Sequence, residues 1–150
     1  MSKGIYGTQA MLASTTATTA TTAYGDIVDL FQFLGGDQPH LEGIAFVLDL
    51  TDAQAASGDK LDVYIQTKLD GTNWVDVVRF TQILGNGSNT LRYFAKIERG
   101  TALAEFENGT GLGAAAARDL FGRQWRVKHV VTDGGAHGQS FTFSVSATPM

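Results

Sequence analysis

Hydrophobic and polar residues alternate along several short segments of the chain. The clearest alternation spans residues 60–69, KLDVYIQTKL, where the odd-numbered positions hold Leu, Val, Ile, Thr and Leu. The even-numbered positions hold Lys, Asp, Tyr, Gln and Lys. A period of two residues is that of a β-strand with one buried side and one solvated side. The segment is therefore predicted to be a strand whose odd-numbered face is buried.

Other segments show the same kind of pattern and are separated by glycine-bearing turns. They are residues 26–34, 41–50, 73–84, 90–98, 123–132 and 139–147. Several short strands with such turn signals indicate an antiparallel sandwich or jelly roll. The fold class predicted is all-β, an antiparallel β-sandwich or jelly roll of about seven to eight strands.

The chain before residue 25 has a different composition. Residues 14–23 are almost entirely Thr and Ala, which offer a core only methyl-sized apolar groups. Two interpretations are open for residues 1–24: a weakly ordered tail, or an extended arm that pairs with a neighbouring subunit. The candidate partner-binding residues of the arm are Ile5, Tyr6, Met11, Leu12 and Tyr24. Residues 25–150 are predicted to form a single domain, which should stay folded when residues 1–24 are removed.

One long segment interrupts the series of strands. Residues 99–122 contain no alternation, and a loop of this length inside a domain is often functional. Two interpretations are open for it: an insertion at one end of the sandwich, or a segment that reaches toward a partner. Its Ala-rich part, residues 114–121, is a candidate short helix that would end before Gly122.

Composition narrows the class of protein. The chain holds 11 Lys and Arg against 15 Asp and Glu, for a net charge of −4, and it has no Cys. This charge argues against a general nucleic-acid-binding surface. The lack of Cys excludes disulfides and thiolate metal sites. No apolar run is long enough to span a bilayer, and the first residues lack the apolar core of a signal peptide.

The search for catalytic or metal-binding motifs gives no candidate. His40, His129 and His137 lie in separate segments without the close spacing of a zinc site. No GxSxG elbow is present, and the glycines of residues 109–113 are spaced as GxGxG and not as a dinucleotide loop. We therefore expect no enzyme activity, no cofactor and no metal.

The phrase DGTNW at residues 70–74 predicts a tight hairpin, because Gly accepts the positive φ that such a turn requires. Alternation from Trp74 places it with Val78 and Phe80, so we expect Trp74 in the core; the alternative is an exposed platform for a ligand. Further along, Arg126 and Lys128 share one face of a strand, and the adjacent Trp125 should point to the opposite side. An RNA-binding sheet would require aromatic residues on the same exposed face as the basic ones, and none is expected there.

Residues 59–98, with the DGTNW turn at their centre, resemble a hairpin found in small jelly-roll proteins of tailed bacteriophages. These include capsid decoration, or cement, proteins, which are often trimers on the outside of the capsid at junctions of major capsid subunits. The resemblance implies a homotrimeric virion protein that is made in the host cytoplasm and binds the major capsid protein. It implies no nucleic-acid partner and no membrane partner.

The same hairpin is also similar to that of galactose-binding, discoidin-like jelly rolls, which carry an SxDGxxW phrase. Here Lys68 and Leu69 precede the turn where that family has Ser. This second resemblance implies a carbohydrate-binding or receptor-binding module of a phage tail or fibre. Its candidate aromatic platforms are Tyr64, Trp74, Tyr93 and Trp125.

Overall fold

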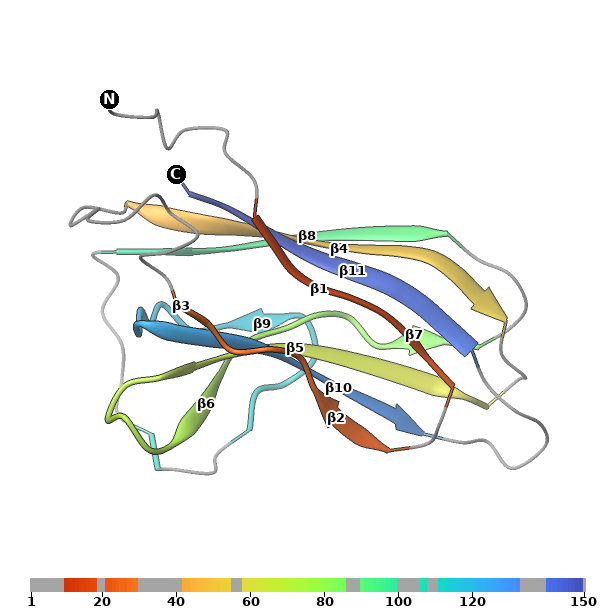
Figure 1. Cartoon of the computed structure of the whole chain (residues 1–150), viewed down its shortest axis with the longest axis horizontal. Coiled ribbons are helices and arrows are strands. Elements are labelled where there is room, and N and C mark those ends of the chain that lie inside the picture. Colours follow the sequence, from red (N-terminus) through yellow and green to blue (C-terminus); the bar gives the residue numbers. More distant parts are fainter. Residues whose placement is uncertain are drawn as a thin grey trace.

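The computed structural model describes residues 10–18, 21–29, 42–54, 58–85, 90–99, 106–107, 111–132 and 140–149. Within these residues there are strands and turns and no helix. The strands form two sheets that lie face to face as a sandwich (Figure 1). The predicted all-β, antiparallel sandwich is therefore confirmed.

The first sheet has four strands in the order β1-β11-β4-β8. Their bounds are β1 Ala10–Ala17, β11 Ser140–Pro149, β4 Gly43–Gln54 and β8 Leu91–Glu98. Every neighbouring pair in this sheet is antiparallel.

The second sheet follows the order β2-β10-β5-β6-β9, with two short strands beside this path. The bounds along the path are β2 Thr22–Tyr24, β10 Gln124–Thr132, β5 Lys60–Lys68, β6 Trp74–Arg79 and β9 Ala116–Ala117. The short strand β3 (Val28–Asp29) pairs with β10, and β7 (Ile83–Leu84) pairs with β5.

The chain crosses repeatedly between the two sheets. It places β11, the last strand, between β1 and β4 of the first sheet, and β10 between β2 and β5 of the second (Figure 1). Residues 10–17 and 22–24 of the predicted arm are thus strands of this sandwich, paired with β11 and β10 of the same chain.

The core lies between the two sheets and is built from the inward residues of the long strands. Phe46 of β4 packs on Trp125 of β10, with ring centroids 5.9 Å apart. Both residues are fully buried, as are Phe141 and Phe143 of β11. Each such aromatic side chain removes about 150–250 Å² from water on folding, so these four rings are a large part of what holds the sheets together.

The side chains of β5 alternate between the two sides of the sheet as predicted, but the outer side is less exposed than predicted. The odd-numbered residues Leu61, Val63, Ile65 and Thr67 are buried, as predicted. The even-numbered face is not simply solvated, because Asp62 and Gln66 are each only 6% exposed. Both side chains are buried by polar partners on the neighbouring strands, and not by the apolar core.

Strand β6 corrects the prediction for Trp74. Ile65 lies opposite Val78 while Gln66 lies opposite Asp76, so Val77 is an extra residue in a β-bulge. Because of this bulge, Trp74 and Asp76 point to the opposite side from Val78. Trp74 is half-buried on the outer side of the sheet and is not a core residue.

The candidate helix at residues 114–121 is also wrong. Residues 114–115 are a turn with Ala115 at φ 55°, and β9 then pairs with β6. The backbone N–H of Arg118 donates to the carbonyl of Val77 at 2.7 Å. Hydrogen bonds to a distant strand replace those that a helix would make, so the helix propensity of the alanines is overridden.

Candidate binding face

The outer side of the second sheet carries three aromatic and four basic side chains on neighbouring strands. We call this surface the cation–aromatic face; its residues are Tyr24, Tyr64, Lys68, Trp74, Arg79, Arg126 and Lys128. The strand register aligns several of them in a row across the sheet. Tyr24 of β2 lies opposite Lys128 of β10, which lies opposite Tyr64 of β5. Tyr64 lies in turn opposite Arg79 of β6.

The adjacent rows place polar and basic residues beside the aromatic rings. Arg126 of β10 lies opposite Gln66 of β5, and Gln66 lies opposite Asp76 of β6. Lys68 and Trp74, at the start of the hairpin turn and just after it, form the last pair of the β5–β6 ladder. Direct and diagonal neighbours of this kind are close enough for long side chains to touch.

Several cations lie over aromatic rings on this face. The guanidinium carbon of Arg126 is 3.9 Å from the ring centroid of Tyr24 and 4.2 Å from that of Trp74. The Nζ atom of Lys128 is 4.0 Å from the ring centroid of Tyr64. At partly exposed positions each such contact stabilises by about 0.5–1 kcal/mol. The contacts therefore restrict these side chains to defined positions.

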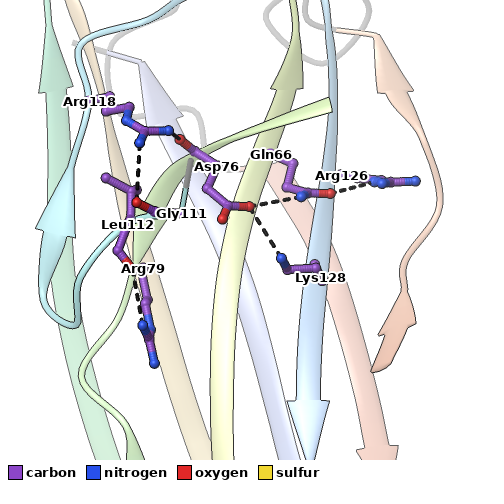
Figure 2. A network of polar contacts seen from close by, with 8 residues as sticks. All are labelled: Gln66, Asp76, Arg79, Gly111, Leu112, Arg118, Arg126 and Lys128. Atoms are coloured by element: carbon purple, nitrogen blue, oxygen red, sulfur yellow. Dashed lines mark hydrogen bonds and ion pairs between the residues drawn. The ribbon is translucent and has the colours of Figure 1, made fainter. Parts of the chain in front are cut away.

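A polar network connects β6, β5 and β10 on the same face (Figure 2). The Nε2 of Gln66 donates to Asp76 Oδ1 at 2.8 Å, and Arg126 Nε donates to Gln66 Oε1 at 2.8 Å. Lys128 Nζ lies 3.4 Å from the same Asp76 oxygen. Gln66 is therefore oriented on both sides, and it fixes the direction of the Arg126 side chain.

A second ion pair lies further along the same face. Arg79 Nη2 donates to Asp62 Oδ1 at 3.0 Å, and Gln82 Nε2 donates to Asp62 Oδ2 at 2.8 Å. Arg79 Nη1 donates to the carbonyl of Leu112 at 3.0 Å. The hydrogen bond to Asp62 raises the pKa of Arg79, so the guanidinium of Arg79 stays charged at any ordinary pH. The pair accounts for the burial of Asp62.

Burial changes the proton affinity of two members of the face. It raises the pKa of the Tyr64 phenol, since a phenolate would be poorly solvated there. Burial also lowers the pKa of Arg126, because the two rings exclude water from the cation. Arg126 remains charged, but its charge is incompletely solvated.

The face carries an excess of positive charge on a chain of net charge −4. Its two carboxylates, Asp62 and Asp76, each pair with one basic side chain. Lys68 and Arg126 have no carboxylate partner among the residues that the structure describes. Two positive charges are thus available to an external anion.

Part of the predicted insertion, residues 99–122, supports the face from the side of β6. Arg118 Nη1 donates to the backbone carbonyl of Asp76 at 3.1 Å, and Nη2 donates to that of Gly111 at 3.3 Å (Figure 2). The guanidinium carbon also lies 4.0 Å from the ring centroid of Phe106. Arg118 therefore holds this segment against β6.

Three of the candidate partner-binding residues of the N-terminal region are described by the structure, and these three lie in different places on the sandwich. Tyr24 is 53% exposed and lies on the cation–aromatic face. Met11 is 60% exposed but belongs to β1, in the other sheet, and Leu12 is buried in the core. Ile5 and Tyr6 lie outside the described residues.

The expectation that Arg126 and Lys128 lack aromatic neighbours on their face is wrong. Alternation correctly placed Trp125 inside, where it is fully buried and unable to serve as an exposed platform. The aromatic residues on the outer side come from three other strands. The even-numbered position of Tyr64 was a usable signal, whereas the position of Trp74 depends on the bulge in β6.

The remaining candidate chemistry gives no site. Within the described part of the chain, no group of three or more His, Cys, Asp or Glu could hold a metal ion. His129 packs edge-on against Phe143, with centroids 5.4 Å apart, and burial lowers its pKa. His40 and His137 lie outside the described residues. The described residues also contain no helix long and apolar enough to cross a membrane.

Comparison with known proteins finds no relative of this chain. No protein-family model matches the sequence, and neither a curated protein nor a solved structure matches it.

Proposed function

We propose that the chain is a non-catalytic structural protein of a tailed-bacteriophage virion. Its role is that of a decoration protein, which binds the outside of the capsid and stabilises contacts between major capsid subunits. The observation that carries the proposal is the cation–aromatic face, a sheet surface in which the guanidinium of Arg126 lies over the rings of both Tyr24 and Trp74. Tyr, Trp and Arg are the residues most enriched where protein surfaces bind each other tightly.

The order of the strands supports a jelly roll as the specific form of the sandwich. Numbering only the eight strands β1, β2, β4, β5, β6, β8, β10 and β11 in sequence gives sheets ordered 1-8-3-6 and 2-7-4-5. Placing the last strand beside the first, and the next-to-last beside the second, is the pairing expected of an eight-stranded jelly roll. This is the fold that the phage resemblance implies.

The segment that carries the resemblance occupies a central place in the sandwich. Residues 59–98 include β5, β6, β7 and β8, so they contribute to both sheets. Four of the seven residues of the cation–aromatic face lie on the β5–β6 hairpin itself: Tyr64, Lys68, Trp74 and Arg79. The homotrimer and the location on the capsid exterior are parts of the same proposal.

Co-sedimentation with phage heads tests the proposal. Purified chain is mixed with heads assembled from the major capsid protein of the same phage, and the bound fraction is measured over a range of chain concentrations. We expect saturation at a fixed number of copies per head. Absence of the folded chain from the pellet at every concentration would overturn the proposal.

A carbohydrate-binding or receptor-binding module is the second candidate. The observation that favours it is the exposure of Tyr24 together with the half-buried Trp74 on one sheet face. Against it, the Trp74 ring already lies beneath two cations, Arg126 at 4.2 Å and Lys68 at 4.9 Å from its centroid. A sugar stacking on this ring would have to compete with them, so the protein-binding function is preferred.

A further inference from the structure

The side chain of Arg126 is held between two aromatic rings that come from different strands. Tyr24 is on β2 and Trp74 is on β6, whereas Arg126 itself is on β10. The distances of 3.9 and 4.2 Å from the guanidinium carbon to the two ring centroids are those of stacked groups. The two contacts therefore restrict the position of the guanidinium before any partner binds.

One edge of this guanidinium is occupied and the other is not. Its Nε donates to Gln66 Oε1 at 2.8 Å, and Gln66 is itself fixed by its hydrogen bond to Asp76 (Figure 2). Among the described residues, neither Nη1 nor Nη2 of Arg126 has a hydrogen-bond partner. The two terminal nitrogens thus present an unpaired pair of donors.

This arrangement fits a carboxylate. Two parallel N–H donors match the two oxygens of a carboxylate in a bidentate hydrogen bond, which a lysine cannot form. Because the rings and Gln66 already fix the guanidinium, little side-chain entropy is lost on binding. Because the rings exclude water from the guanidinium, its positive charge is poorly solvated, consistent with the lowered pKa of Arg126. An anion bound there would stabilise this charge.

The charges around Arg126 favour a single carboxylate over a polyanion. Asp62 and Asp76 lie on the same face, and the chain as a whole carries a charge of −4. A nucleic-acid backbone is bound through several cations along its length, and among the described basic residues of the face only Lys68 and Arg126 lack a carboxylate partner. A side-chain carboxylate needs only Arg126, with Lys68 available as the neighbouring cation over the Trp74 ring.

We propose that Arg126 is the anchor of a binding site for the side-chain carboxylate of an acidic protein segment. The inference rests on the proposed function and makes it more specific, because it assigns an acidic residue to the partner surface that contacts Arg126. The site consists of Arg126, its two stacking rings Tyr24 and Trp74, and the orienting Gln66.

The test uses an acetylated and amidated octaglutamate peptide as the probe. The ¹⁵N-labelled chain is titrated with the peptide while the side-chain Nε–Hε signals of the arginines are followed by NMR. We expect a saturable shift of the Arg126 signal. Arg126→Lys keeps the charge but loses the bidentate geometry, so it should weaken binding about tenfold or more.

A matched control is Arg92→Lys, which alters an exposed arginine that pairs with Asp49 on the other sheet. This variant should bind the peptide as the unaltered chain does. Tyr24→Ala, at an exposed position, is a second test variant, and it should weaken binding several-fold by removing one stacking ring. Backbone NMR spectra establish that each variant is folded.

Several results would overturn the inference. The first is an Arg126 signal that the peptide does not shift. The second is a peptide affinity that Arg126→Lys and Arg92→Lys weaken equally, or that Arg126→Lys and Tyr24→Ala both leave unchanged. The third is tighter binding of inorganic phosphate or octathymidylate than of octaglutamate. If the chain still co-sediments with heads in such a case, the proposed function stands and only the carboxylate site falls. If the chain binds octaglutamate but does not co-sediment with heads, the carboxylate site stands and the proposed function falls.

Discussion

Gly122 lies against the backbone of β5, and the lack of a side chain allows this contact. A Cβ atom at this position would overlap the carbonyl oxygen of Lys68 and the hydroxyl of Thr67. The Gly122 carbonyl also accepts a hydrogen bond from the Trp125 indole at 2.9 Å, so the segment cannot move away freely. We expect Gly122→Ala to lower the free energy of unfolding by about 2 kcal/mol or more, measured by urea denaturation.

Gly113→Ala is the control for this substitution. A Cβ at Gly113 would have no atom within 4 Å, so its free energy of unfolding should be unchanged or slightly raised. Equal destabilisation by both substitutions would mean that the close approach at Gly122 is not what makes glycine necessary there.

Asp70 closes the hairpin turn with its side chain. Its Oδ1 accepts hydrogen bonds from the backbone N–H groups of Asn73 and Thr72, at 2.7 and 2.9 Å, and its Oδ2 accepts one from the Asn73 amide. These bonds, the one from the Asn73 backbone first, lower the pKa of Asp70 from 3.8 to about 2. The folded carboxyl thus binds its proton less readily than the unfolded one.

The stabilisation from Asp70 is therefore fully present above pH 3.8 and is lost as the pH falls toward about 2. We expect an NMR titration of the Asp70 carboxyl carbon to have its midpoint near 2. Asn73→Ala should raise this midpoint, because it removes one of the donors. A midpoint close to 3.8 in the unaltered chain would show that the turn does not form in this way.

The two tryptophans show how far residue patterns alone can be followed. Alternation along residues 123–132 predicted the inward direction of Trp125, and its complete burial agrees. The same reasoning failed for Trp74, because the bulge at Val77, three residues further on, reverses the alternation. No residue in NWVDVVRF marks the position of that bulge, since Val occurs on both sides of it.

At the scale of elements, β1 shows that the N-terminal region contributes to the sandwich. It pairs with β11 along most of its length, and Leu12 and Ala17 point into the core. This pairing changes the expectation for removal of residues 1–24, which should now destabilise the sandwich in addition to removing Tyr24 from the cation–aromatic face. The Thr/Ala segment has low hydrophobicity, so the sequence pattern did not predict that it forms a strand of the sandwich.

Adjacent residues of β1 provide a sharp test of its place in the fold. Leu12 is 4% exposed and Met11 is 60% exposed. We expect Leu12→Ala to lower the free energy of unfolding by about 2–5 kcal/mol, as truncations in a core do. Met11→Ala should change it by no more than about 0.5 kcal/mol. Equal, small effects in urea denaturation would mean that β1 is not docked in solution.

The segment of residues 111–120 illustrates why an element can be mispredicted. Its alanines have the highest intrinsic helix propensity, but that preference is worth only about 1 kcal/mol or less per residue. Pairing of β9 with β6 and the hydrogen bonds of Arg118 to Asp76 and Gly111 outweigh it. Asp76 of β6 lies 42 residues from Arg118 in sequence, so no local pattern could reveal this pairing.

At the scale of the whole molecule, alternation and glycine turns were sufficient for the class of fold but not for the pairing of strands. The β5–β6 hairpin was predictable, because its turn is local. The pairing of β1 with β11 was not, since the Thr16 and Thr142 hydroxyls that meet at 3.0 Å are 126 residues apart in sequence. The cation–aromatic face has the same origin: it forms only when β2, β5, β6 and β10 come together.

The central claim is that this face attaches the chain to the outside of a phage capsid. Electron cryomicroscopy of heads saturated with the chain tests it most directly, because the density shows both whether the chain is bound and which side it presents. We expect the chain at fixed positions on the capsid exterior, with the outer side of the β2-β10-β5-β6 sheet against the capsid. Bare heads, or chains attached through the β1-β11-β4-β8 sheet, would contradict the account.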